Sequence, residues 1–177
     1  MNQQRYTLPA IALHWAQAAI VLWLLWLGWT MTDLPKGAER SAAYSLHKSL
    51  GLLVFLLLIV RLAWRRRQPP PPLAASGWEA NLAHATHHAL YGFLFLAPVA
   101  GYLASSFTPY ALKFFGFEIP KAGWPDESLN AVFKQLHQVV VWGGAGLILL
   151  HVAGALKHVV KRDGMLQRML PGKAFNN

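Results

Sequence analysis

The segment QLHQVVVWGGAGLILLHVAGAL, residues 135–156, decides the fold class because it is long enough to cross a lipid bilayer as a helix. It contains 22 residues without a formal charge, whereas a transmembrane helix needs about 20 predominantly apolar residues. The whole chain of 177 residues is 55% hydrophobic and only 13% charged, which is about half the charged fraction of ordinary soluble domains. We therefore expect a membrane protein.

Three further hydrophobic stretches precede this segment. Residues 6–32 and 81–112 carry no formal charge and are also long enough to span a bilayer. The remaining stretch is uncharged only over residues 49–60, but Lys48 and Arg61 lie about 20 Å apart along a helix, so their side chains can reach the two interfaces. A buried core helix is the alternative there. We predict an all-α transmembrane four-helix bundle, a single membrane domain over residues 1–177, with helices at about 9–31, 44–64, 82–107 and 132–160.

The charged residues are distributed unevenly between the two ends of this bundle. The end with both termini carries ten basic and two acidic residues, and the opposite end carries six basic and five acidic ones, which gives the net charge of +9. Because basic residues favour the cytoplasmic side of a membrane, we expect both termini to be cytoplasmic. The cluster at residues 65–67 would then face anionic lipid headgroups. We expect no nucleic-acid binding, since no basic folded domain accompanies it.

Histidines are the main ionisable residues of the predicted spans. The chain has no cysteine, which excludes disulfides, iron–sulfur clusters, thiolate zinc sites and covalently attached c-type haem. No span interior carries a carboxylate, which argues against a proton-coupled transporter. Ionisable residues are costly inside a membrane and indicate function there. The histidines are His14, His47, His84, His87, His88, His137, His151 and His158.

Four of these histidines form two pairs at matching depths. His137 and His151 are 14 residues apart on the fourth predicted helix, so they share a face and lie about 21 Å apart along its axis. His47 lies three residues into the second predicted helix, at the depth of His137, and His14 lies five residues into the first, at the depth of His151. The pairs His47/His137 and His14/His151 can each supply both axial ligands of a b-type haem. Taken singly, each residue can instead be a hydrogen-bonded interfacial histidine.

Two other groups of residues have alternative interpretations. His84, His87 and His88 compete for ligation, because i, i+3 and i, i+4 spacings on a helix can hold a metal; an interfacial cluster or contacts to haem propionates are the alternatives. The glycines between His137 and His151 allow either ordinary helix packing or the close approach of a flat macrocycle. They are Gly143, Gly144 and Gly146.

Six short motifs then follow one another in a specific order. They are His14-Trp15, Leu46-His47, LAHATH at residues 82–87, Leu136-His137, Leu150-His151 and MLQRMLP at residues 165–171. Their order and spacing resemble the bacterial cytochrome b561 family of di-haem inner-membrane proteins, over nearly the whole chain. The resemblance implies two haem b groups held by His14, His47, His137 and His151. It also implies an oxidoreductase that oxidises superoxide and reduces ubiquinone, as the best-understood members of the family do.

Related haem b proteins provide the alternative function. They anchor a respiratory dehydrogenase or hydrogenase and pass its electrons to quinone, and a metal transporter without haem is a third hypothesis. For the superoxide hypothesis, cations at the outer end would attract the anion, and His158 is a candidate quinone contact or an interfacial residue near lipid headgroups. The outer cations are Lys36, Arg40 and Lys48. The expected partners are membrane lipid, quinone and superoxide or a redox protein, and the oligomeric state stays open.

Overall fold

The structure, a computed structural model, describes residues 5–72 and 77–170, so Pro171 at the end of the last motif lies outside the described residues. Four long helices account for most of these residues, and all four are long and apolar enough to cross a membrane. The prediction of an all-α four-helix bundle is therefore confirmed. The helices are α1 (Leu8–Thr30), α2 (Ala38–Arg67), α3 (Gly77–Ser106) and α4 (Glu127–Lys161).

Polar turns extend α2, α3 and α4 beyond the apolar ranges that the sequence suggested. The beginning of α4 shows why: the backbone N–H of Leu129 donates to Asp126 Oδ1 at 2.9 Å, and such a side-chain cap satisfies a free donor of the first turn. The helix thus begins at Glu127 rather than near residue 132. Hydrophobicity marks only the part of a helix that meets lipid, whereas capping decides where the helix begins.

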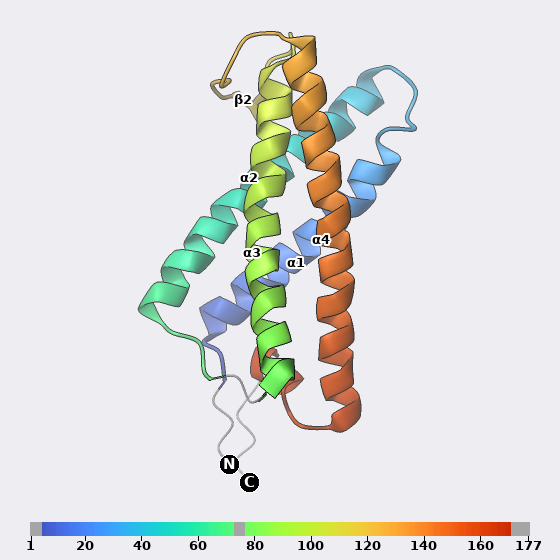
Figure 1. The fold of residues 1–177 in the computed structure, drawn as a ribbon. Helices are drawn as coiled ribbons and strands as arrows, with labels where there is room; N and C mark the ends of the chain where they lie inside the picture. The colour runs from blue at the N-terminus through green and yellow to red at the C-terminus, as the bar shows by residue number, and fades with distance from the viewer. Residues whose placement is uncertain (1–4, 73–76, 171–177) are drawn as a thin grey trace.

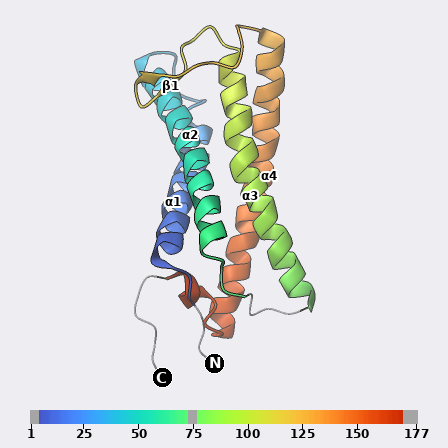
Figure 2. The ribbon, with the colours of Figure 1, turned by 90° about the vertical axis from the view of Figure 1, so that its left-hand side faces the viewer.

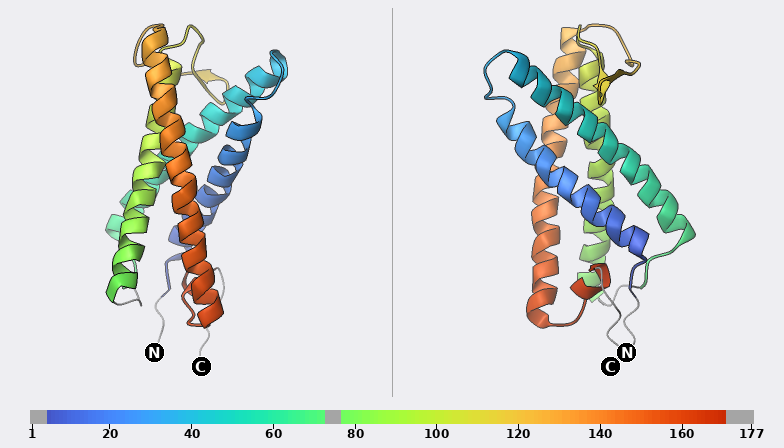
Figure 3. Two further views of the ribbon diagram at one scale, coloured as in Figure 1. Left: turned by 45° about the vertical axis from the view of Figure 1, so that its right-hand side comes forward. Right: turned by 180° about the vertical axis from the view of Figure 1, so that it is seen from behind.

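The four helices pack as two crossed pairs (Figure 1). In this arrangement α3 packs along α4, α1 packs along α2, and α2 also contacts α3. Viewed from behind, α1 and α2 cross the α3–α4 pair obliquely (Figure 3). The small core at the crossing consists of Val21, Val54, Leu58, Phe93, Leu94 and Ala97. Many large apolar side chains point outward instead, including Trp29, Leu149 and Val160, as expected for helices whose solvent is lipid.

A hairpin closes the bundle at the end opposite the start of α1 (Figure 2). Strands β1 (Lys113–Phe114) and β2 (Phe117–Glu118) pair antiparallel, and Gly116 in the turn has a φ of +94°, a conformation that glycine adopts without strain. The backbone N–H of Phe115 donates to Ser49 Oγ at 2.9 Å. This bond fastens the hairpin to α2. We call this end of the molecule the outer end.

A short C-terminal segment closes the other end, which we call the inner end. Here the 3₁₀ helix η1 (Leu166–Met169) lies beneath the start of α1. Arg168, which is buried, donates to the carbonyl of Pro72 at 2.9 Å, and Trp15 Nε1 donates to the carbonyl of Met169 at 2.7 Å. The segment therefore ties α1 to the connection that follows α2.

Candidate functional site

The two histidine pairs expected from the sequence face each other in the folded chain. At the outer end, the ring centroids of His47 on α2 and His137 on α4 are 6.2 Å apart, with the rings 83° from coplanar. At the inner end, the ring centroids of His14 on α1 and His151 on α4 are also 6.2 Å apart, with an interplanar angle of 69°. Helix α4 thus contributes one histidine to each pair.

This separation fits two imidazoles that share one metal. A metal–imidazole nitrogen bond is about 2.0 Å long, and ring bonds of ordinary length put that nitrogen about 1.1 Å from the ring centroid. Two rings on opposite sides of one iron therefore have centroids about 6 Å apart. The donor set, four neutral nitrogens and no thiolate, also suits b-type haem.

Glycines leave room beside both outer rings. A Cβ atom at Gly28 would lie 3.0 Å from His47 Cε1, and one at Gly101 would lie 3.2 Å from His137 Nδ1. Both distances are tighter than ordinary van der Waals contact, so a side chain at either position would press on a histidine ring. Sequence analysis missed these two glycines, because only the helix crossing places them opposite the histidines.

One of the glycines within α4, Gly144, lies against a neighbouring helix. A Cβ atom at Gly144 would collide with the ring of Phe93, whereas Gly143 and Gly146 have nothing within 4 Å of that position. Gly144 is therefore a packing position between α3 and α4. Of the two interpretations that the sequence allowed, the structure favours helix packing for this residue.

A hydrogen bond orients one ring of the outer pair. His137 Nδ1 donates to the carbonyl of Ala97 at 2.8 Å, which leaves the lone pair of the neutral ring on Nε2. Metal-binding histidines commonly have such a bond on the second nitrogen. His47 Nδ1 is buried and has no hydrogen-bond partner among the described residues. Of the outer pair, the ring on α4, His137, is therefore the one that a hydrogen bond orients.

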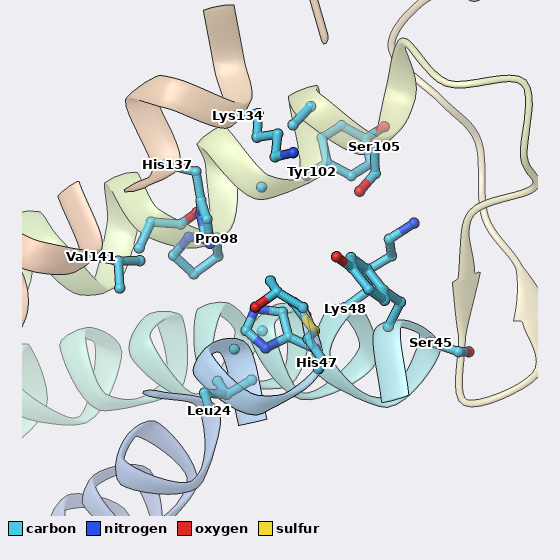
Figure 4. A pocket seen from close by; sticks show the side chains of 18 of the residues that line it. Leu24, Ser45, His47, Lys48, Pro98, Tyr102, Ser105, Lys134, His137 and Val141 are labelled. Atoms are coloured by element: carbon cyan, nitrogen blue, oxygen red, sulfur yellow. The ribbon is translucent and has the colours of Figure 1, made fainter. Parts of the chain in front are cut away.

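A large cavity surrounds the outer pair (Figure 4). Its volume is about 1500 Å³, and residues from all four helices line it, among them His47, His137 and Pro98. This volume is larger than that of ordinary ligand pockets, which is about 300–1,000 Å³. Five cations and one carboxylate belong to the lining: Lys36, Arg40, Lys48, Lys113, Lys134 and Asp33. Sequence analysis singled out the first three cations, but Lys113 and Lys134 come from the hairpin and from α4, and only the fold brings them to the same cavity.

The histidines at the start of α3 separate into two groups. The ring of His87 lies 5.4 Å from that of His151, so this residue adjoins the inner pair. His84 and His88 are exposed, and His88 Nδ1 donates to the carbonyl of His84 at 2.7 Å. Within residues 5–72 and 77–170, no three His, Asp or Glu side chains gather as a candidate metal site.

His158 lies at the inner end, where it pairs with a carboxylate beyond α4. Its Nδ1 is 2.6 Å from Asp163 Oδ2. This hydrogen bond, helped by the N–H of Met165, holds the pKa of Asp163 below its usual value. The pair is half exposed, so it has access to solvent at the membrane surface.

Comparisons with known proteins all point to one family. The profile of a family described as prokaryotic cytochrome b561 matches residues 5–172. Cytochrome b561 homolog 2 of Escherichia coli is 36% identical, with 98% of this chain and 95% of that protein aligned. Cytochrome b561 homolog 1 of the same organism is 28% identical over 94% of this chain and 97% of its own length. A protein of Yersinia pestis named as a probable superoxide oxidase, CybB, is also 28% identical, over 96% and 98% of the two chains.

Proposed function

Since the chain belongs to the prokaryotic cytochrome b561 family of haem b electron-transfer proteins, we propose that it oxidises superoxide at the outer end and reduces ubiquinone. It is a multi-pass protein of the bacterial inner membrane. In the proposed reaction, two superoxide anions each give up one electron and become dioxygen. One ubiquinone takes up both electrons and two protons to form the quinol.

We assign two haem b groups to the histidine pairs, His47 with His137 and His14 with His151. The observation that carries this assignment is the equal 6.2 Å ring separation of the two pairs, at opposite ends of one helix. Bound there, haem would supply reversible one-electron transfer, and the histidines of each pair would hold its iron. His87 adjoins the inner pair as a neighbour of the ligands in this proposal.

The chain's own charges favour an anionic donor at the outer end. Five cations against one carboxylate line the cavity around His47 and His137, and such a cluster raises the local concentration of an anion. The relative from Yersinia pestis, with superoxide oxidase in its name, supports the same choice. The effect is electrostatic, so the rate with superoxide should fall as salt is added.

The inner end supplies the protons in this proposal. We place the ubiquinone headgroup near His158, because an imidazole can donate a hydrogen bond to a carbonyl and release a proton. Asp163, 2.6 Å from His158 Nδ1, would hold the ring and stabilise its protonated form. The positive charge of residues 65–67 supports a cytoplasmic location for this end, from which the protons would be taken.

Stopped-flow mixing with superoxide tests the function directly. The purified holoprotein with a short-chain ubiquinone should accelerate superoxide decay and form one quinol for every two superoxide anions consumed. A preparation reconstituted without haem is the control. Unaltered superoxide decay, in a protein whose haem still equilibrates with quinol, would contradict the proposal. It would favour an anchor subunit that passes electrons from a respiratory dehydrogenase or hydrogenase to quinone.

A further inference from the structure

Arg61 of α2 brings a fixed positive charge to the inner histidine pair. Its Nη2 lies 3.2 Å from His14 Nδ1, and its Nη1 donates to Gln17 Oε1 at 3.2 Å. Gln17 is only 1% exposed, and its Nε2 donates to the carbonyl of Val54 at 3.1 Å. The guanidinium is thus held from two sides by groups of α1.

No carboxylate neutralises this charge in the part of the chain that the structure describes. The guanidinium instead lies over the ring of Tyr91, 5.4 Å from its centroid. A cation within a membrane helix is costly and is usually retained for a function. The orientation of the chain in the membrane does not by itself require Arg61, because the exposed basic residues 65–67 follow on the same helix.

At the outer pair, cations line the cavity, but among the described residues none has a hydrogen bond to either histidine ring. His137 Nδ1 donates to a backbone carbonyl, and His47 Nδ1 has no described hydrogen-bond partner. Lys48 follows His47 in the chain, but Figure 4 shows its amine directed away from the His47 ring. The two pairs therefore share one ring separation and differ in the charge that adjoins them.

We infer that Arg61 is a positioning residue that raises the reduction potential of the inner haem. The inference rests on the proposed function, since it requires a haem at each histidine pair. Reduction adds one electron to the centre, and a fixed cation nearby stabilises the reduced form, more strongly in a poorly polar interior than in water. Electrons from the outer end would then be drawn toward the inner end more strongly than they would be without Arg61.

Haem binding at the inner pair would change the hydrogen-bond partner of Arg61. Arg61 would still raise the reduction potential of that haem. A guanidinium only donates hydrogen bonds, so His14 Nδ1 accepts in this geometry. Ligation through Nε2 requires the proton on Nδ1, and Arg61 must then turn to another acceptor, for which a carboxylate of the haem is suited. Removing Arg61 would leave that carboxylate uncompensated, which again disfavours the added electron.

Redox titration of the holoprotein, followed by the visible spectrum of its haems, tests this inference. The wild-type protein should show two one-electron transitions, and the inner transition is identified in a His137→Ala background. Arg61→Gln should shift the reduction equilibrium of the inner haem at least tenfold toward the oxidised form, about 59 mV for one electron, and leave the outer transition in place. Arg66→Gln removes an exposed charge from the same helix and should shift neither transition by more than about twofold.

A second variant keeps the test decisive if Arg61→Gln fails to assemble. Gln17→Glu keeps the size of the side chain and the bond to Arg61, and it gives up the bond to the carbonyl of Val54. Its carboxylate neutralises the guanidinium, so it should lower the inner potential in the same way. The inference is overturned if Gln17→Glu leaves the inner transition in place. It is also overturned if Arg61→Gln shifts that transition no more than Arg66→Gln does. Either result leaves the proposed function intact. A wild-type protein with a single transition contradicts the two-haem proposal itself, and the inference with it.

Discussion

At the scale of single residues, the two histidine pairs are alike in spacing and unlike in surroundings. His137 is oriented by the carbonyl of Ala97, and His14 contacts the guanidinium of Arg61. His137 and His14 are thus held by different neighbours, and the ligand assignments of the two pairs can be tested separately. The ligand assignments themselves stay predictions.

Substitution of one outer ligand should remove one haem. His137→Ala should reduce the haem content of the purified protein from two per chain to one, because the outer iron loses an axial ligand while the inner pair, about 21 Å away along α4, is untouched. Haem content by absorbance against protein concentration measures this. His87→Ala is the matched control and should retain both haems; loss of one would make His87 a ligand.

The space beside His47 provides a second prediction at this scale. Gly28→Ala would put a methyl group 3.0 Å from His47 Cε1 and should turn the ring, so that outer haem occupancy falls several-fold. Gly92→Ala adds the same methyl group to α3 where nothing lies within 4 Å, at a residue that does not line the outer cavity, and it should keep full occupancy. Equal haem content in the two variants would show that the space beside His47 is not required.

At the scale of elements, α4 organises the site because it carries a histidine at each end and packs along α3 between them. Its outward face meets lipid, and Gly144 is its one buried residue. The sequence could place both histidines on one face of this helix from their spacing. It could not show which neighbouring helix Gly144 approaches, since that depends on how α4 is rotated against α3.

The contact between α3 and α4 can be tested by adding a methyl group. Gly144→Ala would collide with the Phe93 ring, and overpacking of this kind costs about 1–3 kcal/mol of stability. We expect a lower Tm in detergent for this variant. Gly146→Ala meets nothing within 4 Å and should leave the Tm unchanged or raise it, because alanine favours helix more than glycine does. The reverse order of the two Tm values would contradict the packing role.

The connection between α4 and η1 should respond to pH. The hydrogen bond from His158 lowers the pKa of Asp163, so the carboxylate stabilises this connection at pH values above the ordinary Asp value of 3.8. That contribution is lost as the pH falls through the lowered pKa. Amide protection of residues 163–169 in hydrogen exchange should therefore decrease at acid pH. Asp163→Asn should have low protection at every pH, and a wild-type-like pH profile in this variant would refute the role of Asp163.

At the scale of the whole molecule, charge and shape give the bundle two different ends. The outer end has the hairpin and the cation-lined cavity, and the inner end has η1, Arg61 and the His158–Asp163 pair. Electron transfer in one direction across a membrane needs such a difference between the two ends of the protein. The orientation of these ends in the membrane is a prediction from basic residues.

Labelling in intact cells tests this orientation, and the chain is well suited to it because it has no cysteine. Lys36→Cys, in the connection between α1 and α2, should react with a membrane-impermeant maleimide added outside spheroplasts. Arg67→Cys, at the end of α2, should react only after the cells are opened. The opposite labelling pattern would reverse the orientation and place the cation-lined cavity in the cytoplasm.

The sequence by itself determined the membrane class, the four helices and the two pairs of histidines. These properties are local: the length of an apolar run sets a span, and a 3.6-residue period places His137 and His151 on one face. The tertiary structure alone decided that Gly28 and Gly101 lie beside the outer rings, that Lys113 and Lys134 join the same cavity, and that Arg61 contacts His14. These contacts depend on how the helices rotate and cross, which is set by packing among side chains far apart in the chain and leaves no local signal in any one segment.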